Sequence, residues 1–183
     1  MNLLFKLAQS FQLFRIKLSG RYKKQNLPFD VSQRLRQARR LLICLPAESS
    51  EAASACQLVP KLKSNWGKCE ITVMQEKRDE FPFVDLADIN VMTYSRSDLS
   101  RFNMPKKSLL QKLAHGSFDL AIDMSVPLHF TNVIITWMCG ADVRVGFYHP
   151  DREAFYNFIL RQRADDSLQG AYESILNYLL SFK

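Results

Sequence analysis

Short apolar segments that are typical of buried strands alternate with segments of helical periodicity from residue 41 onwards. The first of them, LLICL, is continuous and is followed by Pro46, which is typical of a strand buried on both faces. Strands separated by helices at this spacing indicate βαβ units. The sequence therefore predicts an α/β fold, a Rossmann-like three-layer sandwich with a mainly parallel sheet of about five strands. The predicted strands are Leu41–Leu45, Glu70–Met74, Ile89–Thr93, Phe118–Met124 and Val143–Phe147.

Helices are predicted between these strands and at the end of the sequence. Ser50 is expected to cap a helix that continues to about Lys63, with Glu51 in its first turn. A proline can open a helix and a glycine can end one, which delimits the next two helices. The remaining helices are expected at 105–116, 128–139 and 171–180.

Basic residues are concentrated at the N-terminus. Residues 1–40 contain ten Lys and Arg side chains and the single acid Asp30, whereas residues 41–183 contain 15 bases and 17 acids. A basic segment separated in this way from a nearly neutral domain is expected to meet an anionic surface. We therefore divide the chain into a basic helical N-terminal arm, 1–38, and a Rossmann-like domain, 39–183.

The arm is predicted to begin with an amphipathic helix over residues 2–19. Such a helix can pack on its own domain, lie in the plane of an anionic membrane, or contact a protein partner. The side chains expected to contact a membrane or partner are Leu4, Lys6, Leu7, Phe11, Phe14, Arg15, Lys17, Leu18, Arg21, Lys23 and Lys24. A second, short helix is expected from the N-cap Asp30 to Ala38.

Length and composition exclude several classes of protein. The chain has 183 residues, of which 47% are hydrophobic and 23% charged, so it can form one domain with a core of its own and is not disordered. No segment approaches the roughly 20 apolar residues that span a bilayer. The N-terminus does not have the pattern of a cleaved signal peptide, because polar residues such as Lys6 and Gln9 interrupt its apolar part.

The four cysteines are predicted to be buried free thiols. They have no C-x-x-C spacing and no neighbouring His at ligand spacing, so no metal site is expected. Free thiols in apolar segments are typical of a reducing compartment, which favours a cytoplasmic location. The cysteines are Cys44, Cys56, Cys69 and Cys139.

Ligands of an open parallel sheet bind beyond the carboxyl ends of its strands, near the point where the strand order reverses. Three loops are predicted to lie there, after the first, fourth and fifth strands. The first loop, PAESSE, has neither the G-x-G-x-x-G nor the G-x-x-x-x-G-K-[ST] motif, so no nucleotide cofactor is expected, and no other cofactor is predicted. The candidate crevice residues are Glu48, Ser49, Ser50, Glu51, Asp123, Ser125, His129 and His149.

Each chemical role for these residues has a structural alternative. Glu51 is the candidate general base, but a carboxylate in the first turn of a helix is also favoured by the helix dipole. Asp123 is placed to cap a helix or clamp a loop. His129 and His149 can both approach this edge of the sheet, where a histidine can transfer protons near neutral pH.

Three segments carry a resemblance to a known family. They are RLLICLPAESSEAASACQLVPKLK, GSFDLAIDMSVPLHFTNVIITWMCGADVRVGF and SLQGAYESILNYLL. Together they span about residues 39–182 and resemble the N-terminal lobe of glycosyltransferase family 9, the lipopolysaccharide heptosyltransferases, which have a GT-B fold of two Rossmann-like lobes. The resemblance implies a bacterial protein of lipopolysaccharide biosynthesis at the inner face of the cytoplasmic membrane.

Two departures from that family affect the functional interpretation. The family has a Gly-Asp pair after the first strand, whose Asp is the presumed base, and this sequence has Ser50 and Glu51 there. The carboxylate is kept on a longer arm and the flexible glycine is lost. The resemblance also implies that a second lobe binds the nucleotide sugar, and no such lobe follows in this sequence.

These observations favour a non-catalytic binding or scaffold subunit derived from a heptosyltransferase-like lobe. Its basic N-terminal helix is expected to associate with an anionic membrane face or a protein partner. The alternative is the acceptor-binding half of a split glycosyltransferase, which takes a sugar acceptor and uses Glu51 as base. Nucleic-acid binding through the arm is disfavoured, because no aromatic residues are interleaved with the cluster from Arg34 to Arg40 and the domain is slightly acidic.

Overall fold

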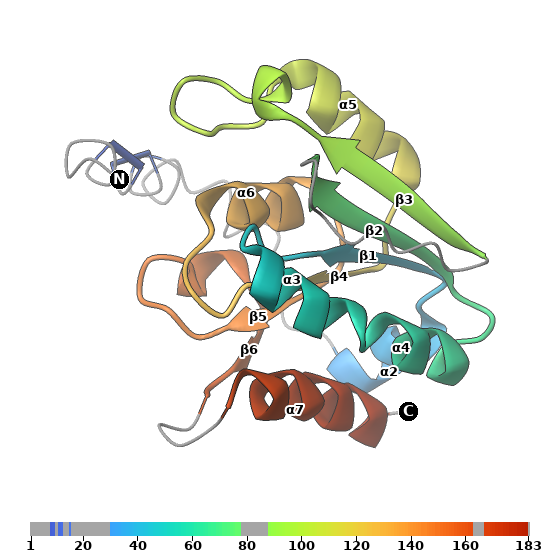
Figure 1. Cartoon of the computed structure of the whole chain (residues 1–183). Helices are drawn as coiled ribbons and strands as arrows, with labels where there is room; N and C mark the ends of the chain where they lie inside the picture. The colour runs from blue at the N-terminus through green and yellow to red at the C-terminus, as the bar shows by residue number, and fades with distance from the viewer. Residues whose placement is uncertain are drawn as a thin grey trace.

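A computed structural model of the chain describes residues 8–9, 11–12, 15, 30–77, 88–162 and 167–182. Its centre is one sheet of six strands in the order β3-β2-β1-β4-β5-β6, flanked by helices on both faces (Figure 1). Every neighbouring pair of strands is parallel. The predicted α/β class and Rossmann-like sandwich are therefore confirmed.

Five of the six strands were expected from the sequence. The sixth, β6, has three residues at the edge of the sheet and pairs with β5 through Val145 and Phe158. A segment this short is below the length at which alternation distinguishes a strand from a loop. The strands are β1 (Arg40–Cys44), β2 (Glu70–Glu76), β3 (Ile89–Tyr94), β4 (Leu120–Asp123), β5 (Val143–Phe147) and β6 (Phe158–Leu160).

The helices lie at the expected positions, but several begin or end at other residues than predicted. The α-helices are α2 (Val31–Gln37), α3 (Ser49–Cys56), α4 (Val59–Asn65), α5 (Lys107–Gly116), α6 (Phe130–Met138) and α7 (Leu168–Ser181), and the short 3-10 helices are η2 (Arg96–Asp98) and η3 (Glu153–Phe155). Asp30 caps α2 as predicted, because its side chain accepts a hydrogen bond from the backbone N–H of Gln33 at 3.1 Å.

The prediction of one helix from Ser50 to Lys63 is wrong. The segment forms two helices, α3 and α4, and the break falls at Gln57 and Leu58, just before Pro60 in the first turn of α4. A proline there is tolerated because the first N–H groups of a helix have no intrahelical partner. The N-cap of α3 is Glu48, so Ser50 lies inside the helix.

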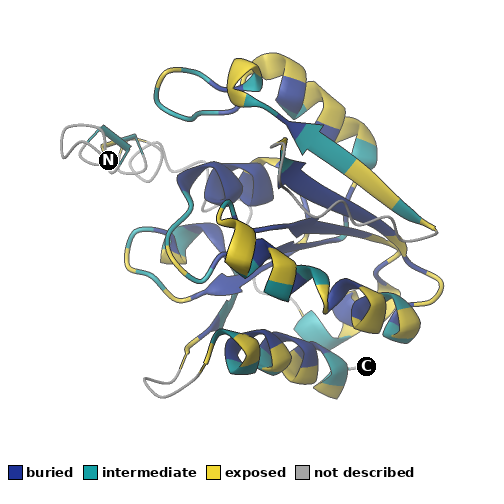
Figure 2. Cartoon of the chain, viewed as in Figure 1, coloured by how far each residue is buried: buried dark blue, intermediate teal, exposed yellow. Residues whose placement is uncertain are grey.

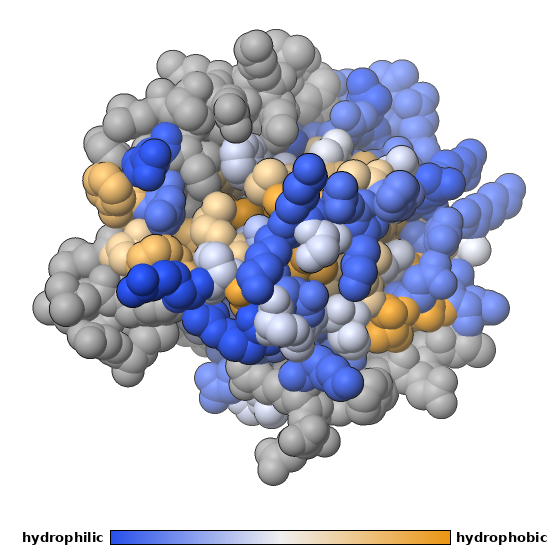
Figure 3. All heavy atoms as spheres, turned by 90° about the horizontal axis from the view of Figure 1, so that it is seen from above, coloured by the Kyte–Doolittle hydropathy of each residue, from blue (hydrophilic) through white to orange (hydrophobic). Residues whose placement is uncertain are grey.

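Strand side chains alternate between two apolar layers. Leu41 and Ile43 face the core shared with α2, α3, α4 and α7, whereas Leu42 and Cys44 face the core shared with α5 and α6. Burial is concentrated in the central strands and in α6 (Figure 2). The side of the molecule that carries α5 is covered mostly by hydrophilic side chains (Figure 3). Both faces of β1 are therefore buried, as the LLICL pattern predicted.

The N-terminal arm is described at few positions. Residues 8–9, 11–12 and 15 are helical, and Phe11 is 58% exposed while Arg15 is also exposed. No helix among the described residues is long and apolar enough to cross a membrane. The other predicted contact residues lie outside the described residues; they are Leu4, Lys6, Leu7, Phe14, Lys17, Leu18, Arg21, Lys23 and Lys24.

Candidate functional site

The strand order reverses between β1 and β4, which are neighbours at the centre of the sheet. Cys44 at the end of β1 is in register with Asp123 at the end of β4. The loop after β1 continues into α3 on one face of the sheet, and the loop after β4 continues into α6 on the other (Figure 1). This is where ligands bind in open parallel sheets, and the predicted crevice loops do meet there.

Asp123 lies in a buried network of polar side chains and not on a surface. Its Oδ2 accepts a hydrogen bond from the Tyr156 hydroxyl at 2.6 Å, and its Oδ1 accepts one from the backbone N–H of Ser125 at 2.9 Å. Arg152 Nη1 lies 3.8 Å from Oδ2, and both charged side chains are 0% exposed. Asp123 and Ser125 are both buried and bonded to protein groups, which agrees with the structural alternative of a loop clamp for Asp123.

Arg152 ties the loop after β5 to the loop after β4. Its Nε donates to the carbonyl of Phe147 at 2.8 Å, while its Nη1 and Nη2 donate to the carbonyls of Ser125 and Val126, each at 2.8 Å. A buried guanidinium needs such acceptors and a nearby carboxylate, because an unpaired buried charge is strongly destabilising. Arg152 is therefore a clamp that holds the loop after β5 to the switch-point loop after β4.

Asn132 of α6 joins the network to the end of β1. Its Nδ2 donates to the carbonyl of Leu45 at 2.8 Å and to Ser125 Oγ at 2.9 Å, and it lies 3.4 Å from Asp123 Oδ1. Its Oδ1 is buried and has no hydrogen-bond partner among the described residues. The single side chain thus connects β1, the loop after β4 and α6.

Burial also determines the protonation of two neighbours of Asp123. The pKa of the Tyr156 phenol is raised well above its ordinary value by burial and by the Asp123 charge, so the hydroxyl keeps its proton and donates a hydrogen bond to the carboxylate. The pKa of Cys44 is also raised well above its ordinary value, mainly by burial and then by the Asp123 charge. A thiol in this state is a poor nucleophile.

Glu51 lies in the first turn of α3, as expected, but apart from the buried network. Its side chain is partly exposed, and its pKa is raised by burial and by the neighbouring Glu48. Glu48, Ser49 and Ser50 are exposed and line an open hollow together with Ala47. Three of the four predicted residues of this loop therefore share a surface, and Glu51 has no hydrogen bond to Asp123.

The two histidines were expected at the same edge of the sheet. His129 is the N-cap residue of α6, and its side chain makes no capping hydrogen bond. His149 pairs locally, since its Nδ1 accepts a hydrogen bond from the backbone N–H of Asp151 at 3.1 Å and lies 3.9 Å from the Asp151 carboxylate. His149 has no bond to Glu51 or Asp123 in the described part of the chain.

The sequence interpretation named neither Asn132 nor Tyr156, and it included Arg152 only as the end of the loop expected after the fifth strand, without a role. A polar Asn within the very apolar segment FTNVIITWM was a usable signal, because buried amides require partners. Arg152 and Tyr156 lie in a loop whose path only the fold defines.

The sequence predicted four buried free thiols and no metal site. Cys44, Cys69 and Cys139 are buried, whereas Cys56 is half-buried, and all four are free. Within residues 30–77, 88–162 and 167–182, no group of three or more His, Cys, Asp or Glu side chains is placed to hold a metal ion.

Comparison with known proteins leaves function open and defines the family. No curated protein matches the sequence. A family model described as a family of unknown function (DUF6913) matches residues 14–182, which includes most of the arm and nearly all of the domain. The chain, with its parallel six-stranded sheet and buried switch-point network, therefore belongs to this family of unknown function, DUF6913.

Proposed function

We propose that this protein is a non-catalytic binding or scaffold subunit, derived from a heptosyltransferase-like lobe, that uses its basic N-terminal arm to associate with an anionic membrane face or a protein partner. The observation that carries the proposal is the network at the switch point. Asp123 and Arg152 are 0% exposed and bonded to protein groups, so they hold the loops instead of contacting a ligand.

The charge distribution supports the arm as the associating element. Ten of the 25 basic residues lie within residues 1–40, and Phe11 and Arg15 are exposed where the arm is described. An apolar and a basic side chain exposed on one helix favour contact with a surface that is both apolar and anionic. We propose the cytoplasm, at the inner face of the membrane, as the place of this contact.

Vesicle flotation and co-purification test the proposal together. A variant in which Arg15, Lys17, Lys23 and Lys24 are changed to Gln should lose anionic-vesicle binding or its stoichiometric partner. A matched variant in which Lys61, Lys77, Lys107 and Lys112 are changed to Gln loses the same charge from the domain and should keep both. Equal behaviour of the two variants, or glycosyl transfer by the purified chain alone, would refute the proposal.

A second proposal is the acceptor-binding half of a split glycosyltransferase, with Glu51 as base. It is supported by the raised pKa of this partly exposed carboxyl beside an open hollow, since a base works best when its pKa approaches the working pH. Transfer would then require a separate nucleotide-sugar-binding lobe. In the reconstituted pair, Glu51→Gln should abolish transfer while Glu48→Gln retains it; equal activities would remove Glu51 from the chemistry.

A further inference from the structure

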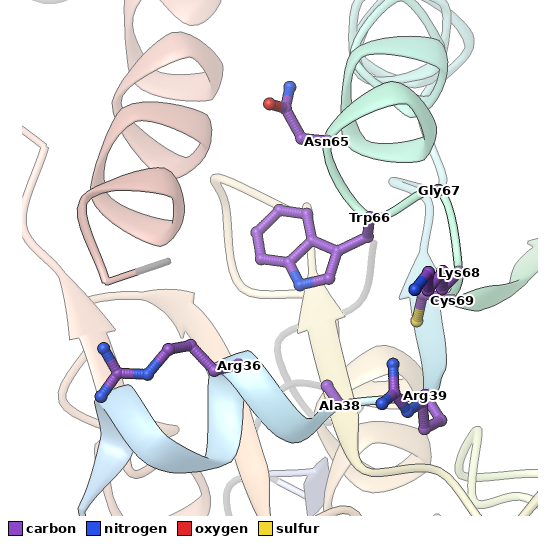
Figure 4. A pocket seen from close by; sticks show the side chains of 8 residues that line it. All are labelled: Arg36, Ala38, Arg39, Asn65, Trp66, Gly67, Lys68 and Cys69. Carbon is purple, nitrogen blue, oxygen red and sulfur yellow. The ribbon is translucent and has the colours of Figure 1, made fainter.

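A pocket of about 300 Å³ lies at the opposite edge of the sheet from the switch point, where β1 and β2 begin. It is formed by the segment joining α2 to β1 and by the turn joining α4 to β2. The Trp66 indole stands between α2 and α4, with Arg39 and Lys68 on one side and Arg36 on the other (Figure 4). None of the candidate crevice residues lines it, whereas Arg36 and Arg39 come from the end of the basic segment 1–40.

The floor of this pocket is apolar and fixed. Ala38, Trp66 and Cys69 are 4%, 6% and 3% exposed. The indole Nε1 donates to the carbonyl of Leu35 in α2 at 3.4 Å, and the backbone N–H of Cys69 donates to the carbonyl of Trp66 at 2.6 Å. The floor is therefore preformed, which reduces the entropic cost of binding a ligand.

The rim of the pocket is cationic. Arg36, Arg39 and Lys68 are exposed, and no acidic residue lines the pocket. Within the described part of the chain, none of these three side chains forms a salt bridge. Three cations around one small hollow repel one another unless an anion lies between them.

Three acids on this side of the sheet are bonded to groups other than the rim side chains. Asp119 accepts hydrogen bonds from the backbone N–H groups of Arg39 and Arg40 at 2.7 and 2.9 Å, and Glu70 pairs with the Arg40 side chain at 3.6 Å. Farther along α2, Arg34 pairs with Asp142 at 2.7 Å. Arg34 and Arg40 are thus paired with acids, whereas the three cationic side chains of the rim have no salt bridge in the described part of the chain.

We propose that this pocket binds a phosphate monoester, with the phosphate between the cations of the rim and the organic group on the apolar floor. Guanidinium groups match the geometry of phosphate oxygens, and a dianion balances more of the rim charge than a carboxylate does. The phosphate can be carried by a small organic molecule or by a lipid headgroup. Arg36 and Arg39 belong to the basic segment 1–40 counted for the scaffold proposal. The site does not depend on that proposal, however, because none of the residues changed in its test, Arg15, Lys17, Lys23 and Lys24, lines the pocket.

Phenyl phosphate is the probe for the first source, because its ring fits an apolar floor and its phosphate is a monoester. Isothermal titration of the full chain should show saturable binding, and NMR should show shifts at the Gly67 amide and the Trp66 indole. Arg36→Gln combined with Arg39→Gln should weaken binding by about tenfold or more, since each charge-assisted contact contributes to affinity. Lys107→Gln combined with Lys112→Gln removes equal charge from α5 and should change it less than about twofold.

Vesicles of phosphatidylcholine with phosphatidic acid test the lipid source. If phenyl phosphate does not bind but these vesicles do, and the Arg36/Arg39 variant loses that binding while the α5 variant keeps it, the ligand is the headgroup. All altered side chains are exposed, and unchanged thermal unfolding of each variant verifies the fold. The proposal is overturned if neither probe binds, or if the two double variants bind equally.

Discussion

At the residue scale, the polar network at the switch point connects sequence to function most directly. A buried carboxylate such as Asp123 is destabilising on its own. Here it is stabilised by hydrogen bonds from the Tyr156 phenol and the Ser125 backbone N–H and by the nearby Arg152 guanidinium. Buried polar groups of this kind are destabilising when one partner is lost and nearly neutral when all are present. The network therefore stabilises the arrangement of the loops after β4 and β5.

Tyr156→Phe removes the donor to Asp123 and leaves the packing intact. We expect the free energy of unfolding to fall by about 1 to 3 kcal/mol, because the buried carboxylate loses a hydrogen bond. Urea unfolding measures this change. Tyr178→Phe is the control, since Tyr178 is 53% exposed; equal effects of the two substitutions would mean that the Tyr156 hydroxyl contributes nothing.

Cys139 makes stability depend on pH. Burial raises its pKa from 9.0 to about 11, and its Sγ donates to the carbonyl of Thr136 at 3.1 Å. Between pH 9 and 11 the unfolded chain loses this proton while the folded chain keeps it, so stability falls as pH rises, by at most about 1.4 kcal/mol per pH unit.

Urea unfolding between pH 7 and 11 tests this linkage. Cys139→Ala should show a smaller decrease than the natural chain when each protein is compared with itself at pH 7, so that the cost of the cavity cancels. Parallel curves for the two proteins would show that Cys139 does not contribute to the pH dependence.

At the element scale, a glycine in β5 allows an aromatic ring to pack closely against the sheet. Gly146 of β5 lies directly under the ring of Tyr156, and a Cβ added there would lie 2.6 Å from a ring carbon. The glycine thus allows the segment after η3 to pack flat on β5 and to place the Tyr156 hydroxyl at Asp123.

Gly146→Ala should destabilise the protein by about 1 to 3 kcal/mol through overpacking, because the ring has to move. Gly67→Ala is the matched control, since the nearest atom to its added Cβ is the Lys63 carbonyl oxygen at 4.0 Å. Thermal unfolding of both variants measures the difference. A Gly146 variant as stable as the Gly67 variant would show that the ring adapts without cost.

At the scale of the whole molecule, the two edges of the sheet have different character. The carboxyl edge carries the buried network and the acids Glu48 and Glu51, while the opposite edge carries the cationic pocket. The basic arm ends with α2, whose Arg36 lines the pocket. The basic N-terminal segment therefore continues directly into the pocket, since Arg36 and Arg39 belong to both.

Removal of residues 1–25 tests whether the arm supports the domain. Because Phe11 is 58% exposed, we expect the melting temperature to stay within about 2 °C of the full chain. Binding to anionic vesicles or to the protein partner should be lost. A fall of many degrees would instead indicate that the arm packs on the domain, which is the first alternative that the amphipathic pattern allows.

The sequence alone determined the α/β class and five of the six strands, because a buried parallel strand requires a continuous apolar run and a helix requires a 3.6-residue period. It also located the loops that meet at the switch point, since the carboxyl ends of parallel strands share one edge. It did not predict β6 or the break before Pro60, because three-residue strands and short turns carry too weak a local pattern.

Only the tertiary structure decided what the candidate residues do. Asp123 ends a strand and Ser125 follows it whether these residues face solvent or the core, and their burial depends on Asn132, Arg152 and Tyr156. The cationic pocket likewise combines α2 with the turn after α4, which no local pattern joins. Local sequence specifies backbone periodicity, whereas the partners of a polar side chain depend on which distant segments the fold brings within hydrogen-bonding distance.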